Sequence, residues 1–150
     1  MRKAIASVAA VLVVAAGTFA AEVDLKDVKC LVAPKGANAS KSADYKDGKV
    51  YFCCGGCVSK FTKNTKKYAE KANHQLVATK QYEQKGCPFS GGEVNKDTAV
   101  KFNGTSVAFC CDGCKSKFVA AKDDAAKLKL VFNDKAFKAA FKKVEKETSK

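Results

Sequence analysis

Eight cysteines in two sets of identical spacing constrain this chain more than any other feature of its sequence. Adding 57 to the position of each cysteine in the first set gives the position of a cysteine in the second. Residues 30–61 and 87–118 align over this offset without a gap, and both segments end in Ser-Lys-Phe. The sequence therefore predicts two copies of one cysteine-bearing unit. The cysteines are Cys30, Cys53, Cys54 and Cys57 in the first unit and Cys87, Cys110, Cys111 and Cys114 in the second.

Each unit is predicted to form a β-hairpin followed by a helix, which indicates an α+β fold. In the second unit, residues 99–102 and 106–109 are predicted as strands joined by Asn103-Gly104, because both turn residues tolerate positive φ. In the first unit we expect the turn at Asp47-Gly48, one residue out of step with the second. Apolar residues recur at helical spacing after each Cys-Cys pair. Asp112 is the expected N-cap of the second helix.

The sequence also predicts where the units begin and end. The first unit is expected over residues 28–80, with a short extra strand at 75–79, and the second over 85–132 after a linker at 83–86. A C-terminal amphipathic helix is expected over residues 133–150, capped by Asn133 or Asp134. The apolar face expected for this helix is Phe137, Ala140, Phe141 and Val144, and the residues expected to anchor the two cores are Phe52, Phe61, Phe109 and Phe118.

The first 20 residues have the pattern of a secretory signal peptide. A basic start is followed by an apolar run over 4–16 and by small residues up to Ala20. The alternative is an uncleaved membrane anchor, because the apolar segment is nearly long enough to span a bilayer. With cleavage after Ala20, we predict an exported protein, periplasmic or secreted, that keeps no transmembrane segment.

Units of about 45–60 residues need disulfides or a bound metal ion, because a hydrophobic core of that size gives only marginal stability by itself. In an oxidising compartment an even number of cysteines favours disulfides, so a secreted structural protein with four bridges is one interpretation. Metal binding is the other. It is favoured by the C-x2-C spacing, by the place of Cys57 and Cys114 in the first helical turn, and by the adjacent glycines.

The adjacent cysteines pose a geometric problem for a four-sulfur site. Neighbouring side chains on a strand point to opposite faces, so Cys53 and Cys54 reach one ion together only if the strand ends between them. Three sulfurs of each unit are therefore expected to bind, while the fourth completes the shell, moves, or passes the ion on.

The second unit resembles a YHS domain, a family related to the TRASH metal-binding domains. The resemblance is carried by Cys-Pro-Phe-Ser-Gly at 87–91, by the Asn103-Gly104 hairpin and by residues 107–114 with Phe118. It implies a treble-clef-like fold that binds soft metals such as zinc and copper. The family pattern of a leading Cys, a long gap and C-x3-C is met by Cys30, Cys53 and Cys57, and by Cys87, Cys110 and Cys114. Cys54 and Cys111 stand where the family often has a small residue.

Together these features predict a binding protein and not an enzyme. The expected cofactor is zinc or copper(I), one ion per unit, and the sequence leaves room for a metal-transport or acceptor protein as a partner. A thiol-disulfide oxidoreductase is disfavoured, because the thioredoxin-like βαβ context is missing. The net charge of +13 gives nonspecific affinity for anions, but no nucleic-acid motif accompanies it. The only histidine, His74, is expected to be a polar cap or surface residue.

Overall fold

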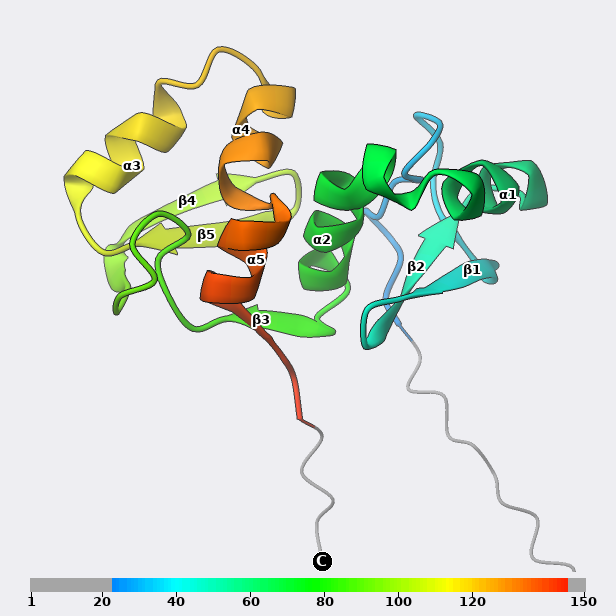
Figure 1. Ribbon diagram of the computed structural model, residues 1–150, viewed down its shortest axis with the longest axis horizontal. Coiled ribbons are helices and arrows are strands. Elements are labelled where there is room, and N and C mark those ends of the chain that lie inside the picture. The colour runs from blue at the N-terminus through cyan, green and yellow to red at the C-terminus, as the bar shows by residue number, and fades with distance from the viewer. Residues whose placement is uncertain (1–22, 146–150) are drawn as a thin grey trace, which may run out of the picture.

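The computed structural model describes residues 23–145 (Figure 1), so the predicted signal peptide at 1–20 and positions 146–150 lie outside it. The fold is α+β, as predicted, with three two-stranded antiparallel sheets in the described part of the chain. In chain order the elements are β1 (Asn38–Tyr45), β2 (Gly48–Phe52), α1 (Gly55–Lys63), the 3-10 helix η1 (Thr65–Tyr68), α2 (Ala69–Ala78), β3 (Tyr82–Gln84), β4 (Asn95–Phe102), β5 (Thr105–Phe109), α3 (Asp112–Val119), α4 (Asp124–Val131), α5 (Asp134–Ala140) and β6 (Phe141–Lys143). Between residues 23 and 145 no helix has the length and apolar character that a membrane crossing requires.

Two β-hairpins, β1–β2 and β4–β5, are each followed directly by a helix. The turn predicted at Asn103-Gly104 is confirmed, and both residues have positive φ. The turn predicted at Asp47-Gly48 is wrong, because the loop is Lys46-Asp47 and Gly48 already pairs with Tyr45 as the first residue of β2. Gly48 serves close packing instead: a Cβ there would lie 2.8 Å from the Leu76 side chain. Both loops therefore have two residues, and they coincide over the offset of 57.

The strand predicted at residues 75–79 is wrong, since this segment continues helix α2 to Ala78. Ala72 and Leu76 are fully buried one turn apart, which gives α2 an apolar face that outweighs the weak strand propensity of Val77 and Thr79. The predicted N-cap of α3 is also corrected by one residue, because Cys111 is the cap and Asp112 begins the helix.

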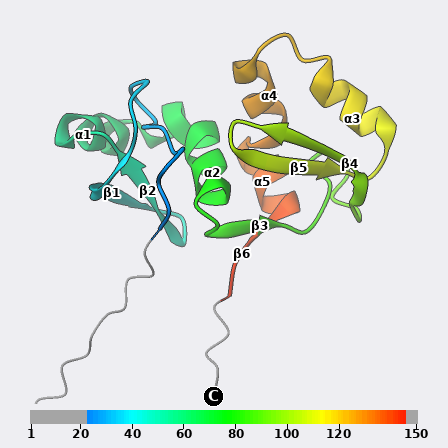
Figure 2. The same ribbon diagram turned by 180° about the vertical axis from the view of Figure 1, so that it is seen from behind.

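The C-terminal helix is much shorter than predicted. Asn133 is its N-cap, as expected, and its side-chain oxygen accepts from the backbone N–H of Ala136 at 3.0 Å. The helix ends at Ala140, however, and Phe141–Lys143 form β6, which pairs antiparallel with β3. The segment predicted as a linker at 83–86 thus supplies half of a small sheet (Figure 2). Pairing of β3 with β6 provides hydrogen-bond partners for backbone N–H and C=O groups of both strands, whereas a longer helix would provide them only for its own residues.

A shared core joins the two hairpin–helix segments. Helix α2 lies in the middle of the molecule and contacts β2 on one side and α4, α5 and β5 on the other (Figure 1). The four phenylalanines predicted as core anchors are all buried. Phe52 packs on Phe61 in the first segment, and Phe109 packs on Phe118 in the second. The buried residues of both segments belong to one hydrophobic cluster, so neither is packed by itself.

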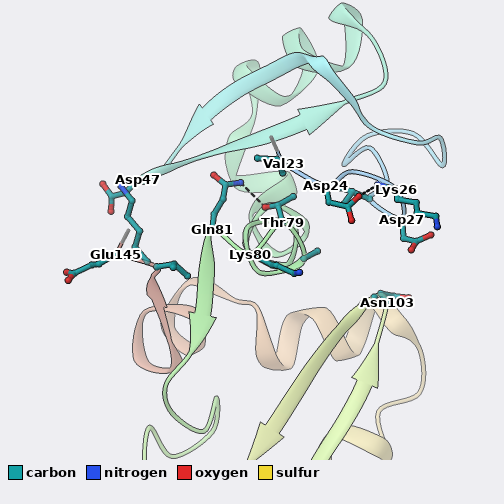
Figure 3. Close-up of a pocket in the computed structure, with 15 residues that line it drawn as sticks. Val23, Asp24, Lys26, Asp27, Asp47, Thr79, Lys80, Gln81, Asn103 and Glu145 are labelled. Carbon is teal, nitrogen blue, oxygen red and sulfur yellow. Dashed lines mark hydrogen bonds between the residues drawn. The ribbon is translucent and has the colours of Figure 1, made fainter. Parts of the chain in front are cut away.

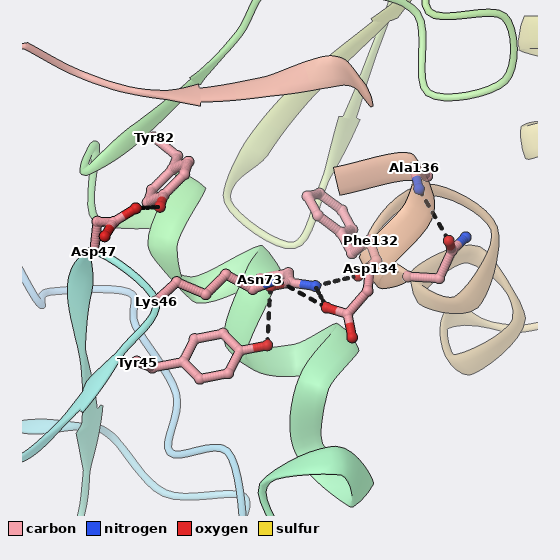
Figure 4. Close-up of polar contacts among 9 residues, drawn as sticks. Tyr45, Lys46, Asp47, Asn73, Tyr82, Phe132, Asp134 and Ala136 are labelled. Carbon is pink, nitrogen blue, oxygen red and sulfur yellow. Dashed lines mark hydrogen bonds and ion pairs between the residues drawn. The ribbon is translucent and has the colours of Figure 1, made fainter. Parts of the chain in front are cut away.

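A buried amide connects the two segments (Figure 4). Asn73 of α2 accepts a hydrogen bond from the Tyr45 hydroxyl at 3.2 Å and donates to the Phe132 carbonyl at 2.8 Å. Its amide also donates to Asp134 at 3.1 Å, and that carboxylate pairs with Lys46 at 2.9 Å. Lys46, followed by Asn73, holds the pKa of Asp134 below its usual value. Asn73 is fully buried, so these bonds replace the water it loses on folding.

We expect Asn73→Leu to destabilise the protein, because it leaves the Phe132 carbonyl and the Tyr45 hydroxyl without their partner. Leaving buried polar groups unpaired costs about 1–3 kcal/mol. Urea unfolding followed by circular dichroism measures the loss. Lys71→Ala on the exposed face of the same helix is the control, and equal stability of the two variants would show that the amide contributes nothing.

Candidate metal centre

The structure gathers six of the eight cysteines into two groups of three. Within each group the sulfur atoms all lie within 4.8 Å of one another. We call Cys30, Cys53 and Cys57 the first sulfur group, and Cys87, Cys110 and Cys114 the second sulfur group. These are the residues of the pattern C-x22-C-x3-C, so the spacing in the sequence becomes proximity in space. Cys54 and Cys111 belong to neither group and are exposed.

Each sulfur group combines a loop, a strand end and a helix start. The leading cysteines sit in similar loops: the Cys30 N–H donates to the Lys35 carbonyl and the Cys87 N–H to the Gly92 carbonyl, both at 2.8 Å. The second cysteine directly follows β2 or β5, and the third lies in the first turn of α1 or α3. Each strand ends before its Cys-Cys pair, but Cys54 and Cys111 keep an extended backbone, and neighbouring side chains on extended backbone point to opposite sides. One thiol of each pair therefore joins the sulfur group, and the other stays exposed.

Two glutamines, Gln75, which is buried, and Gln84, which is half-buried, hold the leading loop of each group against its hairpin. The side chain of Gln75 donates to the carbonyls of Lys29 and Tyr51, both at 3.0 Å, and accepts from the Tyr51 N–H at 2.6 Å. Lys29 precedes Cys30, and Tyr51 lies two residues before Cys53. The amide therefore fixes two of the segments that carry the first sulfur group.

Gln84 makes the same three bonds beside the second sulfur group. It donates to the carbonyls of Gly86 and Ala108 at 2.9 and 2.6 Å and accepts from the Ala108 N–H at 2.9 Å. Gly86 and Ala108 are offset by 57 from Lys29 and Tyr51, but Gln84 is not offset by 57 from Gln75. One glutamine comes from helix α2 and the other from strand β3, so no repeat in the sequence could reveal them.

The sulfur separations suit a shared ion. Cys53 and Cys57 are 3.6 Å apart, as are Cys110 and Cys114. Sulfurs bound to one tetrahedral ion at about 2.3 Å lie about 3.8 Å from each other. All eight cysteines in the described residues are free thiols, and these separations exceed a disulfide bond of about 2.05 Å. Little movement would let each group close around a cation.

Backbone hydrogen bonds lower the pKa of the leading cysteine in each group. Burial disfavours ionisation of Cys87, but the backbone N–H groups of Cys110, Ser90 and Phe89 outweigh it and lower its pKa to about 6. The pKa of Cys30 is also lowered: the N–H groups of Cys53, Val32 and Ala33 outweigh burial there too. A negative sulfur at this position attracts a cation before the other ligands lose their protons.

The third cysteine of each group keeps its proton. The side chain of Cys54 and then burial raise the pKa of Cys57 to about 12. Burial and then the side chains of Cys110 and Cys111 raise the pKa of Cys114 to about 12. Several sulfurs crowd together, so a second negative charge is costly without a cation. Metal binding would supply that cation and release the proton.

The exposed cysteines are more acidic than the third ligands. The N–H of Cys57, then the side chains of Cys57 and Cys53, lower the pKa of Cys54. The N–H of Cys114 and the side chain of Cys110 lower the pKa of Cys111 in the same way.

One polar residue distinguishes the second sulfur group. The Ser90 hydroxyl donates to the Cys110 sulfur at 3.4 Å and also favours the thiolate of Cys87. The residue offset by 57 from Ser90 is Ala33, which has no such donor. The Cys-Pro-Phe-Ser-Gly stretch contained this serine, but its contact with sulfur appears only in the fold.

His74 belongs to neither sulfur group, and it is half-buried inside a helix and not the cap that the sequence offered as one of its two expected roles. It lies within α2, and its ring packs edge-on against Phe132 and Phe102 at 5.0 and 5.7 Å between centroids. Burial lowers its pKa. The two rings come from Phe102 and Phe132, far along the chain, so the sequence of α2 alone could not predict this contact.

One pocket lies apart from the sulfur groups. It has a volume of about 1190 Å³ and lies beside the turn after α2, where the Gln81 amide donates to the Thr79 hydroxyl at 2.7 Å (Figure 3). Charged side chains of both signs line it, among them Asp24, Lys80 and Glu145. A second pocket, of about 570 Å³, reaches Cys30 and His74. The sulfur groups remain the only clusters of metal-binding side chains found among residues 23–145.

We expect Gln84→Met to weaken metal binding at the second sulfur group alone, because methionine fills similar space without the amide that holds Gly86 to Ala108. Loss of a residue that orients ligands lowers metal affinity by about 10–100-fold. Competition titration with Zn²⁺ measures both sites, and Gln75→Met is the reciprocal variant for the first group. Equal effects of either variant on both sites would contradict the assignment of one glutamine to each group.

No family model, no curated protein and no solved structure matches this chain.

Proposed function

We propose that this protein binds a soft metal ion, zinc or copper(I), with one ion in each sulfur group. The observation that carries the proposal is that six cysteines form two sets of three sulfurs, each set within 4.8 Å. Both sets contain cysteine alone, and thiolate ligands select zinc and copper(I) over hard cations. The lowered pKa of Cys87 and of Cys30 supports binding near neutral pH.

The number of ligands bears on the choice of metal. Copper(I) accepts a purely thiolate site. Zinc in a structural site takes four ligands, so it would need a further sulfur or another donor beside the three. The structure offers one candidate for each group in Cys54 and Cys111, and both metals remain within the proposal.

We further propose that each hairpin–helix segment is a treble-clef-like unit of the YHS and TRASH type. Support comes from a leading cysteine in a loop, a hairpin whose end carries the Cys-Cys pair, and a helix that starts with the last ligand. On this proposal the chain is an exported metal-binding protein and not an enzyme. A protein stapled by four disulfides is the alternative, and the free thiols of the structure favour metal over it.

We expect Cys57→Ser and Cys114→Ser each to reduce the bound metal from two ions per chain to one. Serine leaves two sulfurs in the affected group, too few for a stable soft-metal site. Metal analysis of purified protein loaded with Zn²⁺ or with copper(I) measures the stoichiometry. Ser59→Ala and Ser116→Ala, on the exposed surface of the same helices, are the controls. Two bound ions in both cysteine variants would refute the proposed sites.

We expect Ser90→Ala to shift metal release from the second sulfur group to higher pH. The hydroxyl lowers the pKa of Cys87, so its removal raises that pKa, and protons then displace the metal at a higher pH. The site is occupied above this transition and empties as pH falls through it. Retained metal is measured as a function of pH in the Cys57→Ser background, where only the second group binds.

Ala33→Ser in the Cys114→Ser background is the reciprocal control for Ser90→Ala. It should lower the release pH of the first group, if serine donates there as it does in the second. An unchanged release pH in Ser90→Ala would show that the hydroxyl does not assist the thiolate.

A further inference from the structure

Each sulfur group has an exposed neighbour that it does not include. Cys54 is 3.5 Å from the sulfur of Cys57 and 3.9 Å from that of Cys53, and Cys111 is 3.8 Å from the sulfur of Cys110. The two thiols stand on equivalent backbone, with φ and ψ of −158° and 165° at Cys54 and −158° and 167° at Cys111. Each exposed sulfur therefore touches its group from the solvent side.

Helix capping does not account for these two cysteines. Both occupy the N-cap of a helix, a position that favours Ser, Thr, Asp or Asn, and neither side chain makes a capping hydrogen bond. At three other helix starts the chain does use a capping side chain, from Asn64, Asp123 and Asn133. Cysteine thus replaces a stabilising cap only at the two helices that begin at the sulfur groups.

Small residues leave the exposed thiols open to a partner. Gly55 and Gly56 follow Cys54, and both are exposed. A Cβ added to Gly55 would meet nothing within 4 Å, and one added to Gly56 would lie 4.0 Å from the Cys54 sulfur itself. In the second segment, a Cβ on Gly113 would lie 3.8 Å from the Cys111 sulfur. No bulky side chain from these positions shields the thiols.

We infer that Cys54 and Cys111 are transfer ligands, through which a soft metal ion passes between each sulfur group and an external carrier that presents a pair of thiols. The inference rests on the proposed metal-binding function. The exposed sulfur binds the ion as one buried sulfur lets go, and a carrier thiolate then binds in turn. Each step forms one metal–sulfur bond and breaks another, and the proton of the incoming thiol moves to the released thiolate. No electron is transferred.

Exposure separates the fourth sulfur from the three grouped ones, since Cys54 and Cys111 are exposed and the others are buried or half-buried. The three grouped sulfurs lie within 4.8 Å of one another, so on this inference they hold the ion at rest. The Cys54 sulfur contacts those of Cys57 and Cys53, and the Cys111 sulfur contacts that of Cys110, so each exposed sulfur adjoins the strand-end and helix-start side of its group. An ion that leaves by this side need not disturb the loop held by Gln75 or Gln84.

The double variant Cys54→Ser/Cys111→Ser tests the inference on the full chain. Serine is a preferred N-cap, so the variant should fold. Protein loaded with Zn²⁺ is mixed with a synthetic peptide that carries one Cys-x-x-Cys pair, and native mass spectrometry follows zinc on both partners over time. We expect two bound zinc ions at equilibrium, as in the native chain, but transfer slowed by about tenfold or more. The matched control is Ser59→Ala/Ser116→Ala, which should transfer at the native rate.

Three results would overturn the inference, and they are distinguishable. Fewer than two zinc ions in the double variant would make Cys54 and Cys111 permanent ligands and leave the proposed function intact. Full loading with an unchanged transfer rate would show that the exposed thiols take no part. A native chain that binds no zinc and no copper(I) would refute the proposed function, and the inference with it.

Discussion

The hydrogen bonds of two glutamine side chains are the constraint on which both sulfur groups depend. A loop of six residues that carries a single cysteine has many conformations, and fixing it against a hairpin costs conformational entropy. Gln75 and Gln84 offset that cost with three bonds each, made to backbone groups on either side of the ligands. The thiols are therefore brought together before any ion arrives, which is the usual requirement of a preorganised site.

Placing these glutamines requires the two segments to fold as one body. Gln75 belongs to α2, which packs against both hairpins, and Gln84 belongs to β3, which pairs with the C-terminal strand β6. Asn73, two residues before Gln75 in α2, bonds to Tyr45 in the first segment and to Phe132 and Asp134 in the second. A segment of this size has only marginal stability by itself. The common hydrophobic core supplies the buried apolar surface that one segment lacks.

The two sulfur groups share a backbone but not a chemical environment. Ser90 favours thiolate in the second group, where the first has Ala33. Each group nevertheless has a leading cysteine with a lowered pKa, a third cysteine with a pKa raised to about 12 and an exposed fourth sulfur. This gradient from buried to exposed sulfur is the physical basis for proposing that the sites exchange their ions with a carrier as well as hold them.

The sequence by itself determined the features that depend on local spacing. The offset of 57 residues, the Asn103-Gly104 turn and the four buried phenylalanines could all be predicted, because hairpins, helix starts and cysteine pairs follow short-range rules. Tertiary structure decided the rest. It made residues 75–78 helical, turned Phe141–Lys143 into a strand, packed His74 against two aromatic rings, and left Cys54 and Cys111 exposed beside the grouped sulfurs. Each of these outcomes depends on partners far away in the chain, and packing against them outweighs the weak local preference of a few residues.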